Sequence, residues 1–490
     1  MTNTALGSAA PSFSGNVRRP GSLLLAIVVL CVAGGMQEVV LLLHAPGLGI
    51  WVVAPSVVLV AALWRPSPEM TACVLLALGL EALLYLHTGG TRYSDWLLHY
   101  ELARHYGGLS NSTDPALIPG RTPLFQLLTG AFLAHTPAFA VFQVLAVLLN
   151  SLWLWPAGML LQRGRNVLRP GRLVTIAVGP FVLAYSVYTW PWGLCAFFLL
   201  GAVWFSLDEG LISAVGAGAA MAAALLVHPG ALGYVVGLAL YLAFRRKHVV
   251  ATLVTGAAIS ATAIPWVLSV SGGGDLGRMV RASVPARQAV GPLTWLATRA
   301  LTAATSFYPI VPVGPDRPAI NWLIAFFVLT LPGALALTLV PLGRLPRLPA
   351  AALAMLLGGT FVDLLIYPAN NALTGMLDAL YPGVLLLLIL TLGAARGHAV
   401  AWAAVLNIGA GLVFAGCLLW VSNWPAPTDA NLGLKVRFGV RFIADEVGLL
   451  PGAVLVLSAA WLIYLTFDGA VGWRAILKGK LPRPGADVSS

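Results

Sequence analysis

Long apolar runs separated by short polar connections dominate this chain. Most of the runs are about 15 to 25 residues long, which suits a hydrocarbon core that a helix crosses with about 20 residues. Helix is the expected conformation, because a lone strand would leave its backbone polar groups unsatisfied in lipid. The pattern therefore predicts an all-α polytopic membrane protein, a bundle of about 12 to 14 transmembrane helices.

The hydrophobic pattern also places the expected spans and their boundaries. In chain order they are 23–43, 50–64, 70–87, 137–161, 173–188, 190–207, 211–227, 230–244, 250–270, 320–341, 349–366, 382–395, 398–420 and 450–468. The apolar stretch 123–134 is too short to cross, so we expect an interfacial or re-entrant helix there. This gives one transmembrane unit over 23–468 between an N-terminal tail (1–22) and a basic C-terminal tail (469–490).

Composition and charge agree with this class. The chain is 59% hydrophobic and only 9% charged, and its mean hydropathy is +0.88. The net charge of +11 comes from lysines and arginines in short connections and tails, on alternate sides of successive apolar runs. This positive-inside pattern predicts cytoplasmic termini in a plasma membrane, here a bacterial inner membrane. It also argues against a nucleic-acid partner, because no basic face is interleaved with aromatic residues. The four cysteines lie in predicted spans without metal or CxxC spacing.

The predicted topology leaves four large external segments, near 88–136, 271–319, 367–381 and 422–449. The first of them concentrates polar chemistry in a chain that has little of it. Its polar side chains include Asp95, His99, Glu101, Arg104, His105, Asp114 and Arg121. Such a concentration on the external face indicates a functional site there.

Asp95 and His99 are the first candidate pair. In a helix over 94–106 they are four residues apart and share one face. A carboxylate beside an imidazole can bind a divalent cation such as Mg²⁺ or Mn²⁺, or act as a base that the imidazole orients. The alternative is an interfacial helix with a local Asp–His hydrogen bond.

Arg121 is the next candidate. Turn-forming residues precede it, and Pro123 suits the first turn of a short helix, so Arg121 is expected at a helix start near the membrane surface. Its planar guanidinium group can donate two parallel hydrogen bonds to phosphate oxygens. The alternative is an arginine that extends to lipid headgroups.

These pieces together resemble a known family. An external Asp on a short helix, then Arg121-Thr122-Pro123-Leu124-Phe125, a short helix and a span ending at Gln162-Arg163-Gly164-Arg165 resemble the membrane-embedded GT-C glycosyltransferases. The branch with protein O-mannosyltransferases and lipid A aminoarabinose transferases is most similar. Weaker similarity continues through 185–191, 225–247 and Leu377-Asp378-Ala379-Leu380-Tyr381-Pro382. Unlike many members, this chain has no second acid beside Asp95.

The resemblance implies an enzyme that transfers a sugar from a polyprenyl-phosphate donor to a lipid, glycan or protein acceptor on the external face. Asp95 would be the general base, and arginines or a divalent cation would stabilise the lipid phosphate that leaves. The candidate substrate contacts are His99, Arg121, His228, Arg278, Arg281, Asp378 and Tyr381. For His228, an interfacial residue at a helix end is the simpler interpretation.

A transporter or flippase for a lipid-linked or amphipathic substrate is the alternative function. It predicts ionisable residues near the middle of the membrane and interrupted helices in matched halves. Here the polar residues concentrate in external loops, and Asp363 is the main exception. That asymmetry favours the enzyme.

Overall fold

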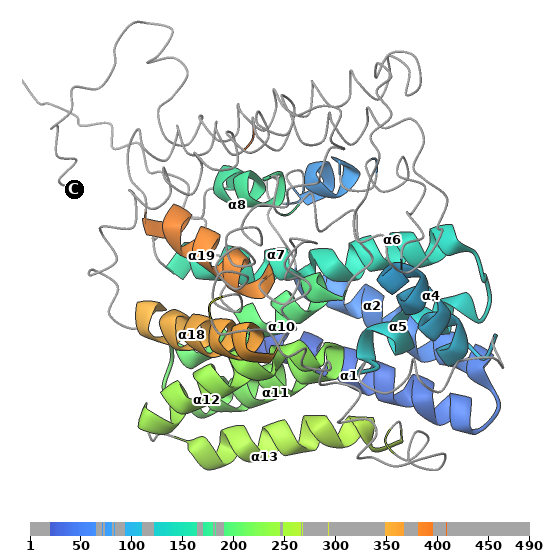
Figure 1. Cartoon of the computed structure of the whole chain (residues 1–490). Coiled ribbons are helices and arrows are strands. Elements are labelled where there is room, and N and C mark those ends of the chain that lie inside the picture. The colour runs from blue at the N-terminus through green and yellow to red at the C-terminus, as the bar shows by residue number, and fades with distance from the viewer. Residues whose placement is uncertain are drawn as a thin grey trace, which may run out of the picture.

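Every element in the part of the chain that the structure describes is a helix (Figure 1). The structure is a computed structural model, and it describes residues 20–64, 94–109, 122–163, 170–179, 191–245, 248–265, 348–366 and 381–394, with isolated positions at 71, 74–80, 83, 182, 267, 293 and 408. The predicted contacts Arg121, Arg278, Arg281 and Asp378 lie outside these residues.

Three helical segments are long and apolar enough to cross a membrane, counted over the described residues. The first is α1 (Pro20–Leu42), and the second joins η1 (Pro46–Gly49) to α2 (Ile50–Trp64). The third runs through α6 (Phe139–Asn150), η2 (Ser151–Trp153) and α7 (Leu154–Arg163). The helices predicted at 23–43, 50–64 and 137–161 are thereby confirmed as long apolar helices.

Shorter helices fill most of the other predicted spans within the described ranges. They are α8 (Pro170–Ala177), α10 (Trp192–Ser206), α11 (Leu211–Val227), η3 (Pro229–Ala231), α12 (Leu232–Arg245), α13 (Val249–Ser260), η4 (Ala261–Ala263), α18 (Leu348–Ile366) and α19 (Tyr381–Ala394). Helix α10 lies at the centre of the bundle, and all 15 of its residues are buried (Figure 1).

Glycines set the closest helix contacts. A Cβ added at Gly237 of α12 would collide with the backbone carbonyl of Ala354 in α18, and one at Gly358 would collide with that of Gly233. A Cβ at Gly218 of α11 would meet the carbonyl of Thr252 in α13 in the same way. Small residues let backbones approach where lipid offers no hydrophobic force between helices. The four helices lie side by side in Figure 1.

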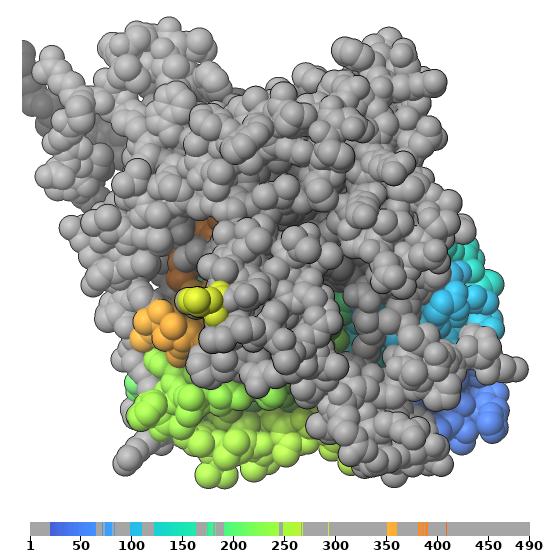
Figure 2. All heavy atoms as spheres, in the orientation of Figure 1, coloured from blue at the N-terminus to red at the C-terminus, as the bar shows by residue number. Residues whose placement is uncertain are grey.

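The outer faces of α12 and α13 are apolar. These two helices form the green surface at the lower left of Figure 2. Their exposed large side chains are Leu232, Val236, Leu240, Phe244, Val250, Leu253 and Val254. Such a continuous apolar exterior is expected where helices face lipid rather than water.

Candidate functional site

The polar segment predicted to be external contains a helix that packs in parallel with the short apolar helix after it. These are α4 (Ser94–Tyr106) and α5 (Leu124–Leu133). His99 of α4 contacts Gln126 of α5, and Gly130 of α5 lies against the carbonyl of Ala103. Further along, Gly107 lies against the backbone nitrogen of Ala134. Because these contacts advance together along both helices, both N-termini lie at the same end.

This register brings Asp95 of α4 level with the first described residues before α5. Asp95 is the second residue of α4, one turn before His99, so the predicted helix over 94–106 is confirmed. The matching position before α5 is Thr122, and Pro123 follows it as the N-cap. Arg121 itself and the side chain of Asp95 lie outside the described part.

His99 and Gln126 form a buried hydrogen bond at this end. The two side chains are 2% and 1% exposed, and Gln126 Nε2 lies 2.7 Å from His99 Nδ1. When the amide donates, Nδ1 is the acceptor and the neutral imidazole carries its proton on Nε2. Phe125 packs edge-on against the imidazole at 6.4 Å. The ring of His99 is therefore held in one orientation, four residues from Asp95.

Two buried polar atoms near this bond have no hydrogen-bond partner among the described residues. They are Gln126 Oε1 and Thr122 Oγ1. Most buried polar groups in proteins are satisfied, and an exception needs a ligand, a water or a functional reason. The start of α5 is thus a point where an added hydrogen-bonding group would be stabilised.

Sequence reasoning missed Gln126, although it is one of only two side chains in α5 that form hydrogen bonds through an amide or hydroxyl. The other, Thr129, bonds back to the carbonyl of Phe125 in its own helix. An amide inside an apolar run was the available signal. It did not indicate which neighbour the amide would meet.

The start of α5 lies beside the C-terminal half of α1. A Cβ added at Gly34 would collide with the side chain of Leu124, and one at Gly35 would lie 2.9 Å from the carbonyl of Thr262. All residues of α5 except Phe132 are buried. Of the two predicted alternatives, this lengthwise packing favours a re-entrant helix over one that lies across the bundle end.

His228 lies at the same level of the bundle. Helices α11 and α13 run in parallel, and Gly218 of α11 contacts Thr252 of α13. The end of α11 is therefore level with η4. His228 follows α11 directly, and η4 contains Thr262, which contacts α1 next to the start of α5. Two predicted site residues, His99 and His228, are therefore brought to one level by different helices.

His228 has a clear structural role there. Its Nδ1 accepts a hydrogen bond of 3.0 Å from the backbone nitrogen of Gly230 and so caps η3. Its ring lies 4.1 Å from the buried ring of Trp192, centroid to centroid. The Trp192 Nε1 is buried and has no hydrogen-bond partner among the described residues. The interfacial interpretation from sequence included neither this cap nor the contact with the indole of Trp192.

Tyr381 and Asp363 also lie toward this end. Tyr381 begins α19 and is 4% exposed, and a Cβ at nearby Gly383 would lie 3.1 Å from the hydroxyl of Tyr234 in α12. Helix α18 is antiparallel to α12, and Gly358 lies opposite Gly233 near the start of α12. Asp363 follows Gly358 along α18 and therefore lies beyond the start of α12. The side chain of Asp363 is outside the described part.

The described residues do not form a metal site. No group of three His, Cys, Asp or Glu side chains comes together among them. Nδ1 of His99 is hydrogen-bonded to Gln126, and Mg²⁺ and Mn²⁺ favour several oxygen ligands. The Asp95–His99 pair stays a predicted metal site, because the side chain of Asp95 lies outside the described part.

Comparison with known proteins gives no relative: no family model, curated protein or solved structure matches this chain. The fold and the site define a helical protein with three candidate membrane-spanning segments in its described part. Two of its buried polar side chains, His99 and Gln126, meet near the starts of two parallel helices.

Proposed function

We propose that this protein is a membrane glycosyltransferase of the GT-C type, which moves a sugar from a polyprenyl-phosphate donor to an acceptor on the external face. The observation that carries the proposal is the parallel packing of α4 and α5. It puts the turn with Asp95 beside the residues that lead into α5, next to the buried His99–Gln126 bond.

Two parallel helix N-termini at one end suit an anionic substrate. Each N-terminus carries unpaired backbone N–H groups and the positive end of a helix dipole. The cap residue of α5, Pro123, supplies no side-chain hydrogen bond to these donors. A lipid phosphate that becomes more negative as the sugar leaves would be stabilised there, together with Arg121.

The proposed reaction is a single displacement at the anomeric carbon of the sugar. The acceptor oxygen forms a bond to the anomeric carbon of the sugar, and the bond from that carbon to the phosphate oxygen breaks. The electron pair of the broken bond stays on the polyprenyl phosphate. The acceptor proton moves to the Asp95 carboxylate, as in general-base catalysis.

The buried polar residues of α1 do not favour the transport alternative. Gln37 and Glu38 are 0% and 1% exposed, and they lie in the last two turns of α1 rather than at its middle. Gln37 Nε2 donates a hydrogen bond of 2.8 Å to the backbone carbonyl of Tyr106, which ties α1 to the end of α4. That role is structural, so Gln37 gives no support to a transport pathway.

The test is direct consumption of the donor. Membranes that contain the full-length chain are incubated with a labelled polyprenyl-phosphate sugar and an acceptor fraction of lipid, glycan and protein. We expect the label to move to one acceptor class and free polyprenyl phosphate to accumulate. Uptake of the intact donor across the membrane without loss of its sugar would reject the enzyme in favour of the transporter or flippase.

A further inference from the structure

Helix α5 runs beside the second half of α1 and begins well short of its end. Near the start of α5, Leu124 packs against Gly34 of α1. Just after the end of α5, His135 Nε2 donates a hydrogen bond of 2.7 Å to the carbonyl of Gly47, which follows α1 closely. The two helices are therefore parallel. Gly34 is eight residues before Leu42, so α5 begins about 12 Å short of the end of α1.

The start of α4 lies slightly further from the end of α1. The hydrogen bond between His99 and Gln126 makes these two residues level with each other. Because Asp95 is four residues before His99, its backbone is level with a point two residues before Leu124. That point lies about 3 Å beyond the start of α5, or about 15 Å short of the end of α1.

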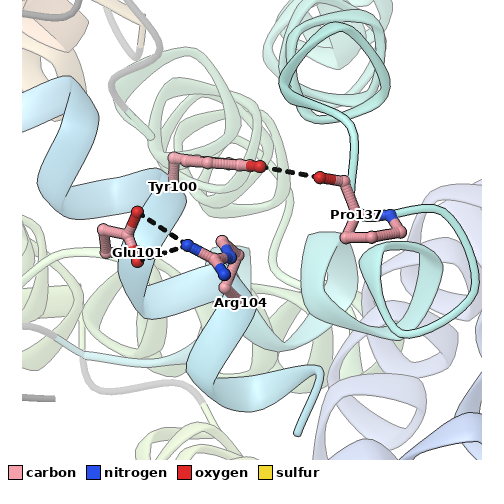
Figure 3. Close-up of polar contacts among 4 residues, drawn as sticks. All are labelled: Tyr100, Glu101, Arg104 and Pro137. Carbon is pink, nitrogen blue, oxygen red and sulfur yellow. Dashed lines mark hydrogen bonds and ion pairs between the residues drawn. The ribbon is translucent and has the colours of Figure 1, made fainter. Parts of the chain in front are cut away.

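The third candidate membrane-spanning segment gives a similar depth. Figure 3 shows Tyr100 of α4, whose hydroxyl donates a hydrogen bond of 2.8 Å to the carbonyl of Pro137. The Tyr100 ring also packs edge-on at 4.9 Å against Phe139, the first residue of α6. Asp95 is five residues before Tyr100 and so lies about 7.5 Å further from the start of α6. The two segments place the start of α4 about 8–15 Å inside their ends.

This depth falls within the hydrocarbon layer. The 23 residues of α1 measure about 34 Å, against a hydrocarbon core of about 30 Å. With α1 as a membrane-spanning helix, each of its ends lies within a few ångströms of a membrane boundary. The starts of α4 and α5 then lie inside the half of the membrane that the predicted topology makes external.

Several side chains at this level are closed to water. His99 and Gln126 are almost completely buried. So are Phe125 and Phe142, whose rings pack edge-on at 6.2 Å. Bulk water therefore does not touch these four side chains.

We propose that α4 and α5 form a re-entrant pair whose depth and burial keep bulk water away from the reacting carbon. The inference rests on the proposed sugar transfer and concerns how the site selects the acceptor over water. In the competing hydrolysis, a water oxygen would form the bond to the anomeric carbon and the bond to the phosphate oxygen would break. The water proton would pass to Asp95, and free sugar would be released. Excluding water from the reacting atoms suppresses this loss.

Phe125 is the side chain to remove, because its ring lies edge-on against the imidazole of His99 at 6.4 Å. Two nearby atoms, Thr122 Oγ1 and Gln126 Oε1, are buried without a hydrogen-bond partner among the described residues. A cavity beside such polar atoms can hold water, whereas a wholly apolar cavity stays dry. Phe125→Ala should therefore admit water to the site.

The first test measures where the sugar goes. Purified full-length protein in lipid nanodiscs receives the labelled donor with and without the acceptor fraction, and free sugar is separated from transferred sugar. We expect wild type to release little free sugar, and Phe125→Ala to raise the ratio of free to transferred sugar about tenfold. Phe132→Ala, the same change at the one residue of α5 that is not buried, is the matched control and should keep the wild-type ratio.

The second test measures water access without the reaction. A cysteine at Thr122 should react with a small charged methanethiosulfonate at least about tenfold more slowly than a cysteine at Leu43. Leu43 is the exposed reference, because it lies directly after α1 and is 70% exposed.

Equal labelling rates at these two positions would overturn the inference, and so would release of free sugar by wild type as fast as transfer. An unchanged ratio in a folded Phe125→Ala would overturn it as well, and thermal unfolding of both alanine variants shows whether they are folded. If no donor is consumed under any condition, the proposed transfer is rejected instead. The labelling rates then decide alone whether the site is closed to water.

Discussion

Gln126 of α5 and His99 of α4 are joined by a hydrogen bond of 2.7 Å between two side chains that are almost completely buried. The bond fixes how the two parallel helices are rotated about their axes. It therefore also fixes which face of α4 carries the position four residues before His99, where Asp95 lies. The proposed site depends on this contact together with the close approach of Gly130 to Ala103.

Replacing Gln126 by leucine should destabilise the protein. Gln126→Leu leaves the buried Nδ1 of His99 without this donor, which costs about 1–3 kcal/mol. Thermal unfolding in detergent measures the loss. Gln143→Leu is the matched control, because Gln143 is also buried but its Nε2 has no hydrogen-bond partner among the described residues. An equal loss in both variants would show that the His99–Gln126 bond does not hold α4 against α5.

The contact of α12 with α18 should not tolerate a side chain at Gly237. In Gly237→Ala the new methyl group would meet the backbone carbonyl of Ala354, and separating the helices should cost about 1–3 kcal/mol of unfolding free energy. The control is Gly21→Ala in α1, where nothing lies within 4 Å of the added atom. Thermal unfolding should fall for the first variant only, and unchanged stability of Gly237→Ala would contradict the close packing.

The predicted topology can be tested by labelling. A cysteine at Asn111, in the first external segment, should react with a membrane-impermeant maleimide in intact cells. A cysteine at the exposed Asp208 should react only after the membrane is opened, because the topology places it in the cytoplasm. The native Cys31 and Cys195 are fully buried and should add little background. Labelling of Asp208→Cys in intact cells would contradict the assignment of sides.

The sequence predicted the helices well, because run length and hydropathy are local properties. The boundaries of α2 and α11 match the expected spans, and α4 covers the expected 94–106. The sequence did not predict which helices pack against each other. The parallel register of α4 and α5 depends on Gly130 meeting Ala103, and the position of α5 depends on Gly34 of α1. These contacts join residues far apart in the chain, and nothing in either segment alone specifies its partner.

The candidate site was predicted in part for the same reason. Asp95 and His99 stood out as polar residues in an apolar chain, and their helix formed as expected. Gln126 did not stand out, because one amide in an apolar run usually packs without further consequence. Its interest comes from what it meets, the imidazole of His99 in another helix.

The most direct test of the proposed function is the rate of sugar transfer by Asp95→Asn, measured in membranes with a labelled polyprenyl-phosphate donor. Asparagine keeps the size of the side chain but cannot take the acceptor proton, so we expect the rate to fall by about 10²–10⁴-fold. Asp208→Asn, at an exposed position far along the chain, should retain the wild-type rate. Full transfer activity in a well-folded Asp95→Asn would contradict the assignment of Asp95 as the base.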